Sequence, residues 1–197
     1  MRKVIAVTNL SLDGVMQAPG RPDEDRRSGF TRGGWAVPYA AMQEAGESMS
    51  NMGALLFGRW TYESFAAFWP KQINNPFTAM LDNMQKYVAS KTLKEPLAWR
   101  NTTLLPGDAA ETVAKLKQEE GKDIVIFGSG VLIQSLMRHG LIDEYALLFH
   151  PLVLGTGRRL FADESIFTNL RLVNAKTTAK GVVSAIYRPA NGDLPVG

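Results

Sequence analysis

The sequence predicts a mixed α/β fold with a mostly parallel sheet, helices on both faces and a C-terminal antiparallel hairpin. Three observations lead to this prediction. Strand-like and helix-like segments alternate up to residue 149, several strand-like runs are apolar throughout, and the last two strand-like runs are separated only by a turn. Alternation favours βαβ units, and continuous apolar runs are typical of parallel strands that are covered on both faces. These features together predict an α/β domain in which helices cover both faces of the sheet.

In the first half of the chain, the apolar run Val4–Leu10 is suited to a buried strand. The segment from Ser11 to Pro38 is rich in Gly, Pro, Arg and Asp, and a loop of this length is expected to be functional or mobile. A helix is expected from Tyr39 to about Asn51. There follow a strand at Gly53–Phe57, a helix at Arg59–Phe68, a helix at Phe77–Met84 that begins at Asn75-Pro76, and a strand at Lys86–Ala89.

The second half continues the alternation and ends in the hairpin. We expect one domain over residues 1–189 and a frayed polar tail over residues 190–197. The expected elements are a strand at Leu97–Leu105, a helix at Ala109–Glu120 between Asp108 and Gly121, a strand at 123–127, a helix at 130–138, a strand at Asp143–Phe149, and hairpin strands at about Leu170–Thr178 and Val182–Arg188.

Composition excludes several classes of function. The chain has no cysteine, which excludes disulfides and thiolate chemistry, and its two histidines, His139 and His150, are too few for a histidine metal centre, so no metal is expected. The net charge of +3 is small and dispersed, so no nucleic-acid partner is expected. No apolar run approaches the roughly 20 residues of a membrane span, and the amino terminus leads straight into a strand. We therefore expect a cytoplasmic protein that does not bind a membrane.

The most informative motif is Gly128-Ser129-Gly130, where a buried strand ends and a helix begins. Backbone N–H groups at such a helix start have no intrahelical acceptor and favour an anion, so a phosphate-bearing cofactor is the first hypothesis. The same Gly-x-Gly pattern also occurs as ordinary turn chemistry.

Three further strand ends carry polar or glycine residues, and the carboxyl ends of parallel strands lie at one edge of a sheet. Asn9 and Asp13-Gly14 follow the first strand, and Gly58-Arg59-Trp60-Thr61 follows the strand at Gly53–Phe57. Ser90-Lys91 follows the strand at Lys86–Ala89. Arg59 could clamp a phosphate and Thr61 could donate to it, and a second phosphate such as the 2′-phosphate of NADP would explain the additional cations. Taken singly, Arg59 and Lys91 are better explained as solvated residues at helix and strand margins, whereas the four strand ends together favour a cofactor site.

With these residues in place, the chain resembles the dihydrofolate reductase superfamily, and in particular the branch related to the C-terminal reductase domain of the bifunctional riboflavin-biosynthesis deaminase-reductase. The matching stretches are Val4–Gly14, Leu56–Ser64, Tyr87–Lys91 and Ile124–Gly157.

The resemblance implies a reductase that binds NADPH and commonly forms a homodimer. The backbone near Asn9 would meet the nicotinamide, with Gly14 shaping the loop beside it, and Gly155 would belong to a turn that closes over the site. Gly58, Arg59 and Thr61 would hold phosphate, and Ser90 and Lys91 would lie beside the adenosine 2′-phosphate. The pyrophosphate and its ribose would be held by Gly128, Ser129, Gly130, Val131 and Leu132.

The chain also departs from the better-known enzymes of the superfamily. Phe127 and Ile133 stand where those enzymes keep polar groups, and no acid aligns cleanly with the one that binds pteridine. The catalytic residue is therefore unknown, and Asp13, Asp25 and Glu47 are the candidates. Trp35 and Phe30 could stack on a flat substrate, although Trp35 could instead anchor the loop against the core. His150, next to Pro151, is expected to be a packed or edge residue rather than a catalytic base.

The leading hypothesis is an NADPH-dependent oxidoreductase that transfers a hydride to a flat pyrimidine- or pteridine-like heterocycle, with the Ser11–Pro38 loop forming the substrate wall. The missing acid also leaves open a nucleotide- or flavin-binding module of the same fold without reductase turnover. A third alternative is a protein that sequesters a drug or a metabolite through Trp35 and neighbouring aromatic residues.

Overall fold

A computed structural model describes residues 1–161 and 168–190, apart from the side chain of Gln43. The chain divides into two compact units. The first unit comprises Met1–Val4 and Asn51–Leu141, and the second comprises Ile5–Ser50 and the described residues from Ile142 onward. The single domain expected over residues 1–189 stays a prediction, and all but the first residue of the expected tail lies outside the described residues.

The first unit contains four parallel strands in the order β4-β3-β2-β5. Leu55, Phe57 and Ile126 are completely buried, as expected for parallel strands that are covered on both faces. The predicted parallel sheet is thus confirmed for this unit. Its strands are β2 (Met52–Gly58), β3 (Gln85–Ala89), β4 (Thr102–Leu105) and β5 (Asp123–Phe127).

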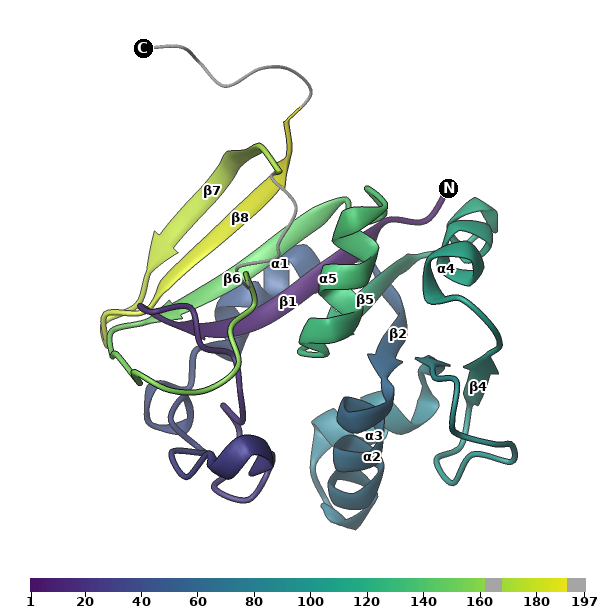
Figure 1. The fold of residues 1–197 in the computed structure, drawn as a ribbon, viewed down its shortest axis with the longest axis horizontal. Helices are drawn as coiled ribbons and strands as arrows, with labels where there is room; N and C mark the ends of the chain where they lie inside the picture. The colour runs from purple at the N-terminus through teal and green to yellow at the C-terminus, as the bar shows by residue number, and fades with distance from the viewer. Residues whose placement is uncertain (162–167, 191–197) are drawn as a thin grey trace. The chain divides into compact units, whose positions relative to one another are not determined.

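Helices connect these strands and cover both faces of the sheet. The crossover from β2 to β3 and the crossover from β4 to β5 run in opposite directions across the strand order, so right-handed connections place their helices on opposite faces. Figure 1 shows these connections in blue, teal and green. The helices are α2 (Arg59–Phe68), the 3-10 turn η4 (Trp69–Lys71), α3 (Pro76–Asn83), α4 (Ala109–Gln118) and α5 (Gly130–Arg138).

The starts of α3 and α4 follow from local capping chemistry. The Asn75 side chain accepts a hydrogen bond from the Phe77 N–H at 2.9 Å, with Pro76 in the first helical position. The Asp108 carboxylate likewise accepts from the Ala110 N–H at 2.8 Å. Both caps were predicted from the sequence and are confirmed.

The second unit contains β1 from Ile5 onward and three later strands in the order β1-β6-β8-β7. β1 pairs with β6 in parallel, whereas β6-β8 and β8-β7 pair antiparallel. The C-terminal hairpin of Figure 1, in yellow-green and yellow, is therefore the predicted one. These strands are β1 (Val4–Ser11), β6 (Glu144–His150), β7 (Leu170–Thr177) and β8 (Val183–Pro189).

Two element predictions were wrong in part. The helix expected from Tyr39 to about Asn51 is broken, because Ala40 takes a left-handed φ of 49° and only short turns follow it. The strand expected at Leu97–Leu105 is reduced to β4, because Asn101 is left-handed with a φ of 54°. Between β1 and β2 the chain forms the 3-10 turns η1 (Arg27–Gly29), η2 (Val37–Tyr39) and η3 (Ala41–Ala45) and the one-turn helix α1 (Gly46–Met49).

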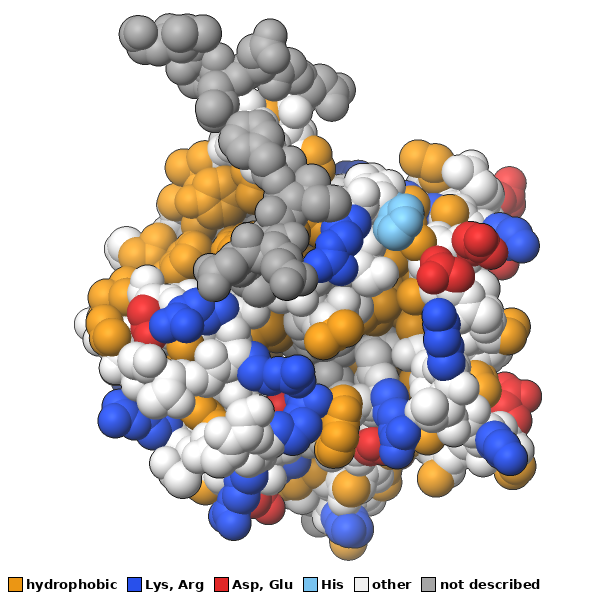
Figure 2. Space-filling view, viewed as in Figure 1, with side chains coloured by type: hydrophobic (Ala, Val, Ile, Leu, Met, Phe, Trp, Pro, Cys, Tyr) orange, Lys and Arg blue, Asp and Glu red, His pale blue; other side chains and the backbone are white. Residues whose placement is uncertain are grey.

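On the face drawn in Figure 2, Lys and Arg side chains lie among acidic, neutral and apolar ones. They do not form one continuous basic patch there. Among the described residues, no helix has the length and apolar character that crossing a bilayer requires.

A buried lysine stabilises the junction between α3 and β3. Lys86 is completely buried, and its Nζ donates to the carbonyl oxygens of Leu81 at 2.7 Å and Met84 at 2.8 Å. The ammonium group therefore satisfies carbonyls at the carboxyl end of α3, where a cation is electrostatically favoured. It also lies 4.7 Å from the centre of the Trp99 ring, and burial lowers its pKa to about 8.

We predict that Lys86→Met lowers the free energy of unfolding by about 1–3 kcal/mol, because the apolar stem is kept while buried carbonyls lose their donor. Urea unfolding of wild type and variant measures this change. Lys94→Met, at an exposed site on the following loop, is the matched control and should change stability by less than about 0.5 kcal/mol. Equal effects of the two substitutions would contradict the capping role.

Candidate functional site

In the first unit, two strand-to-helix turns are linked by one hydrogen bond. Gly128 and Ser129 have left-handed φ values of 55° and 57°, and α5 begins immediately after them. The Ser129 hydroxyl does not cap α5; it accepts from the Gly58 N–H at 3.0 Å, at the start of α2. Gly58 provides no side-chain cap to α2 either. Two helix starts with uncapped N–H groups are thus connected, and both favour an anion.

Arg59 lies at the start of α2 and connects it to the turn after β3. Its Nε donates to Glu63 at 2.9 Å, and its Nη1 donates to the Thr92 hydroxyl at 2.8 Å. The Ser90 hydroxyl accepts from the backbone N–H groups of Thr92 and Leu93, which shapes this turn, and the neighbouring Lys91 is exposed. The guanidinium is therefore oriented by both elements, while its side chain keeps 45% of its surface exposed to an incoming ligand.

The donors of this unit fit the phosphates of a dinucleotide. A Cβ built on Gly128 would lie 3.9 Å from the Thr61 hydroxyl oxygen, which places that hydroxyl beside the Gly128–Gly130 turn. Backbone N–H groups and a hydroxyl suit a pyrophosphate, and guanidinium and ammonium groups suit a phosphate monoester. The chemistry of the donor set is consistent with NADPH, the cofactor that the resemblance implies.

In the second unit, Asp13 ties the loop after β1 to the segment 154–159. Its carboxylate accepts from the Ser11 hydroxyl at 2.6 Å and from the N–H groups of Leu154 and Gly155 at 3.0 and 2.9 Å. The hydroxyl of Ser11 and these two N–H groups hold the pKa of Asp13 at about 2. Arg159 adds an ion pair at 3.4 Å. An acid held in this way is an anchor rather than a proton donor near neutral pH.

The aromatic residues of the long loop form a small core. Phe30 and Trp35 are buried with Val15 and Leu154, and the Trp35 indole N–H donates to the Gln17 carbonyl at 2.7 Å. This packing agrees with the alternative in which Trp35 anchors the loop. Stacking of either ring on a substrate stays a prediction.

A polar pair lies beside this core, at the ends of β1 and β6. Nε2 of the completely buried His150 is 2.9 Å from the Asn9 side-chain oxygen. The rings of Trp35 and Tyr39 meet the imidazole edge to face, with centroids at 5.3 and 5.1 Å. Burial lowers the pKa of His150 to about 4, so the ring is neutral near pH 7.

Comparison with known proteins identifies the family. The RibD C-terminal domain family matches residues 2–184, nearly the whole described chain. The chain belongs to the RibD C-terminal domain family. Within Bacillus subtilis (strain 168), it is 33% identical to the uncharacterized protein YyaP over 144 residues, covering 71% of this chain and 75% of that one. It is 26% identical to the uncharacterized protein YwjB over 189 residues, covering 92% and 95%.

Solved structures show that this RibD C-terminal family member has the predicted dihydrofolate-reductase-like fold. A putative riboflavin biosynthesis protein from Shewanella sp. PV-4 superposes with a TM-score of 0.69 at 19% identity, covering 96% of this chain and 99% of that one. Dihydrofolate reductase from Enterococcus faecalis, complexed with NADP(H), gives a TM-score of 0.60 at 14% identity and covers 96% and 97%. Both the resemblance and the fold class inferred from the sequence are thereby confirmed.

In the first unit the structure joins Gly58 to Ser129, and it orients Arg59 through Thr92, a residue of the third strand end to which the sequence assigned no role. The other candidate acids are engaged elsewhere. Asp25 forms a close ion pair with Arg27; burial raises the pKa of Asp25, but the bonds and charge of Arg27 keep it below its ordinary value. Glu47 accepts from Asn174 and Lys176 on β7 at 3.0 and 3.2 Å. The roles assigned to these residues stay predictions.

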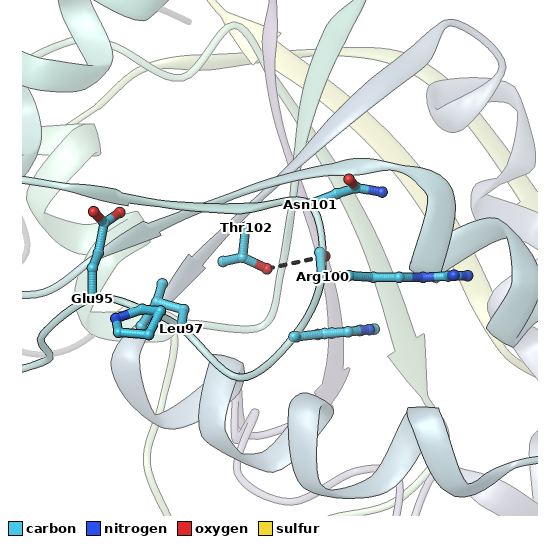
Figure 3. Close-up of a pocket in the computed structure, with 7 residues that line it drawn as sticks. Glu95, Leu97, Arg100, Asn101 and Thr102 are labelled. Carbon is cyan, nitrogen blue, oxygen red and sulfur yellow. Dashed lines mark hydrogen bonds between the residues drawn. The ribbon is translucent and has the colours of Figure 1, made fainter.

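The loop between β3 and β4 lines an open pocket of about 530 Å³ that contains none of the predicted site residues. Figure 3 shows Glu95 and Arg100 projecting on opposite sides of Thr102, whose hydroxyl donates to the Arg100 carbonyl at 3.4 Å. The pocket is bordered by the buried Trp99 and by Pro96, Leu97 and Asn101.

We predict that His150 makes the free energy of unfolding fall as the pH is lowered. Because its pKa in the folded protein, about 4, lies below the ordinary 6.5, the unfolded chain takes up the proton first as the pH falls. His150 therefore contributes stability above pH 6.5 that is lost between pH 6.5 and 4, with a limiting slope of ~1.4 kcal/mol per pH unit. Urea unfolding over this pH range measures the loss.

The control for this prediction is His150→Gln, which cannot be protonated in this range. The difference in unfolding free energy between wild type and variant should shrink or reverse sign as the pH falls to 4. Parallel curves for the two proteins would show that His150 is not buried in its neutral form.

Proposed function

We propose that this protein is an NADPH-dependent reductase that transfers a hydride to a flat pyrimidine- or pteridine-like heterocycle. The observation that carries the proposal is the linked pair of uncapped helix starts in the first unit, with Arg59 oriented beside them. Membership of the RibD C-terminal domain family supports it, as do the names of the structural neighbours, one of which is described as a pyrimidine reductase-like protein of Corynebacterium diphtheriae.

The proposed roles in the first unit follow from the donors present. The N–H groups of Gly130, Val131 and Leu132, together with the Thr61 hydroxyl, bind the pyrophosphate, and Gly58 and Gly128 keep the turns open for it. Arg59 and Lys91 bind the 2′-phosphate, while Ser90 and Thr92 hold the turn and the guanidinium in position.

The proposed roles in the second unit concern the reacting end. The chemistry that bound NADPH supplies is a hydride from C4 of its nicotinamide. Asp13 joins its own loop, which contains Gly14, to the segment 154–159, which contains Gly155. We expect this link to position the backbone near Asn9 for the nicotinamide carboxamide. Hydride transfer depends chiefly on positioning, so the engagement of Asp13, Asp25 and Glu47 in other contacts is compatible with reduction.

One observation favours a second candidate. Because these three acids are held by other groups, a nucleotide- or flavin-binding module without turnover also fits the described side chains. Loss of nicotinamide absorbance with a panel of pteridines, pyrimidines and flavins distinguishes the two. Cofactor binding without oxidation across the panel would favour the binding module. The homodimer and the cytoplasmic location are further proposals that rest on the resemblance.

We predict that NADPH binds more tightly than NADH and that Arg59→Met weakens NADPH binding by about 10- to 100-fold, because one charge-assisted hydrogen bond to phosphate is worth about 1.5–3 kcal/mol. Binding of NADH should change much less. Titrations followed by nicotinamide fluorescence measure both affinities.

Lys91→Met should also lower the affinity for NADPH. Lys94→Met, three residues further along, is the matched control and should leave this affinity unchanged. Failure of both nucleotides to bind at millimolar concentration would reject the proposed cofactor. Equal affinity of wild type for the two would remove the role assigned to Arg59 and Lys91.

A further inference from the structure

The pair formed by Asn9 and His150 has a fixed orientation. β1 and β6 are parallel neighbours, with Asn9 opposite Leu148, so His150, two residues beyond Leu148, lies on the same face of the sheet as Asn9. The side-chain oxygen of Asn9 can only accept a hydrogen bond, so Nε2 of His150 carries the proton in the 2.9 Å contact. His150 is thereby the donor and Asn9 the acceptor.

The remaining imidazole nitrogen is enclosed. Nδ1 of His150 is buried and has no hydrogen-bond partner among the described residues, while Trp35 and Tyr39 pack against the ring. A neutral imidazole with Nε2–H and an enclosed Nδ1 has one directed hydrogen bond, and that bond goes to Asn9.

The consequence for Asn9 is that its amide nitrogen faces away from His150. This nitrogen carries two hydrogens, and its contact in the described structure is the Met42 sulfur at 3.6 Å, a weak acceptor. Asn9 is only half-buried, in contrast to His150. The pair therefore turns the donor side of the Asn9 amide away from His150, near the carboxyl end of β1.

We infer that the Asn9 side-chain amide is a substrate-recognition group that donates to an acceptor atom on the edge of the heterocycle, and that His150 is the positioning residue that holds the amide with its nitrogen outward. This inference rests on the proposed function, since it concerns the substrate of that same site. It predicts selection for a carbonyl edge over an amino edge, because an amino group facing the Asn9 nitrogen would leave donor against donor.

The test uses two flat ligands of one shape, lumazine with two carbonyl groups and 2,4-diaminopteridine with two amino groups, and measures their equilibrium binding without cofactor by fluorescence. Wild type should prefer lumazine by about tenfold or more, the effect of one discriminating hydrogen bond. Asn9→Asp, nearly isosteric, replaces the donor by an acceptor and should reverse the preference.

His150 is tested through the same ratio. His150→Phe frees the amide to rotate, so the lumazine preference should fall toward unity, and His150→Gln, which keeps an N–H donor, should restore much of it. Nitrogen NMR of the histidine ring, with His139→Gln to assign the second of the two histidines, should show Nε2–H. A change of stability alone would move neither the ratio nor the tautomer.

Several results would overturn the inference: equal binding or tighter binding of the diamino ligand by wild type, failure of both pteridines to bind at millimolar concentration, or an Nδ1–H tautomer. These outcomes are distinct from failure of the proposed function, in which NADPH does not bind or is not oxidised while the lumazine preference and its response to Asn9→Asp persist.

Discussion

The hydrogen bond from the Gly58 N–H to the Ser129 hydroxyl organises the first unit. The Ser129 hydroxyl contacts Gly58 and does not cap α5, so the bond holds the start of α2 beside the start of α5. Both helix starts consequently keep donors for an anion that neither helix satisfies internally. Arg59, Thr92 and the Ser90 turn then add a cation at a defined position, so the proposed phosphate chemistry follows from how two neighbouring strands end.

The second unit depends on a comparable anchor. The Asp13 carboxylate joins two loops through the Ser11 hydroxyl, the N–H groups of Leu154 and Gly155, and an ion pair with Arg159. The hydroxyl and the two N–H groups lower the pKa of Asp13 to about 2. Beside this anchor, Trp35 and Phe30 bury the long loop, and Trp35 helps to enclose His150. Asp13 and Trp35, which the sequence suggests as a catalytic acid and a stacking residue, thus make structural contacts in this unit.

Local signals predicted most elements and part of the candidate site. The caps at Asn75 and Asp108 and the turn at Gly128–Gly130 each depend on residues a few positions apart, and they could be read directly from the sequence. The bond between Gly58 and Ser129 joins residues 71 positions apart, and the bond between Asn9 and His150 joins residues 141 apart, so neither has a local signature. The helix expected after Tyr39 failed because the left-handed Ala40 and the packing of the loop outweigh modest helix propensity.

The central claim is that the uncapped start of α5 binds the phosphates of a dinucleotide. Backbone amide NMR during titration with NADPH tests it most directly, because a phosphate that accepts from an N–H group changes the resonance of that amide. We predict that the amides of Gly130, Val131 and Leu132 are among those that shift most, and that Ser129→Ala reduces these shifts by removing the hydrogen bond to Gly58. Saturable NADPH binding with these amides unperturbed would contradict it.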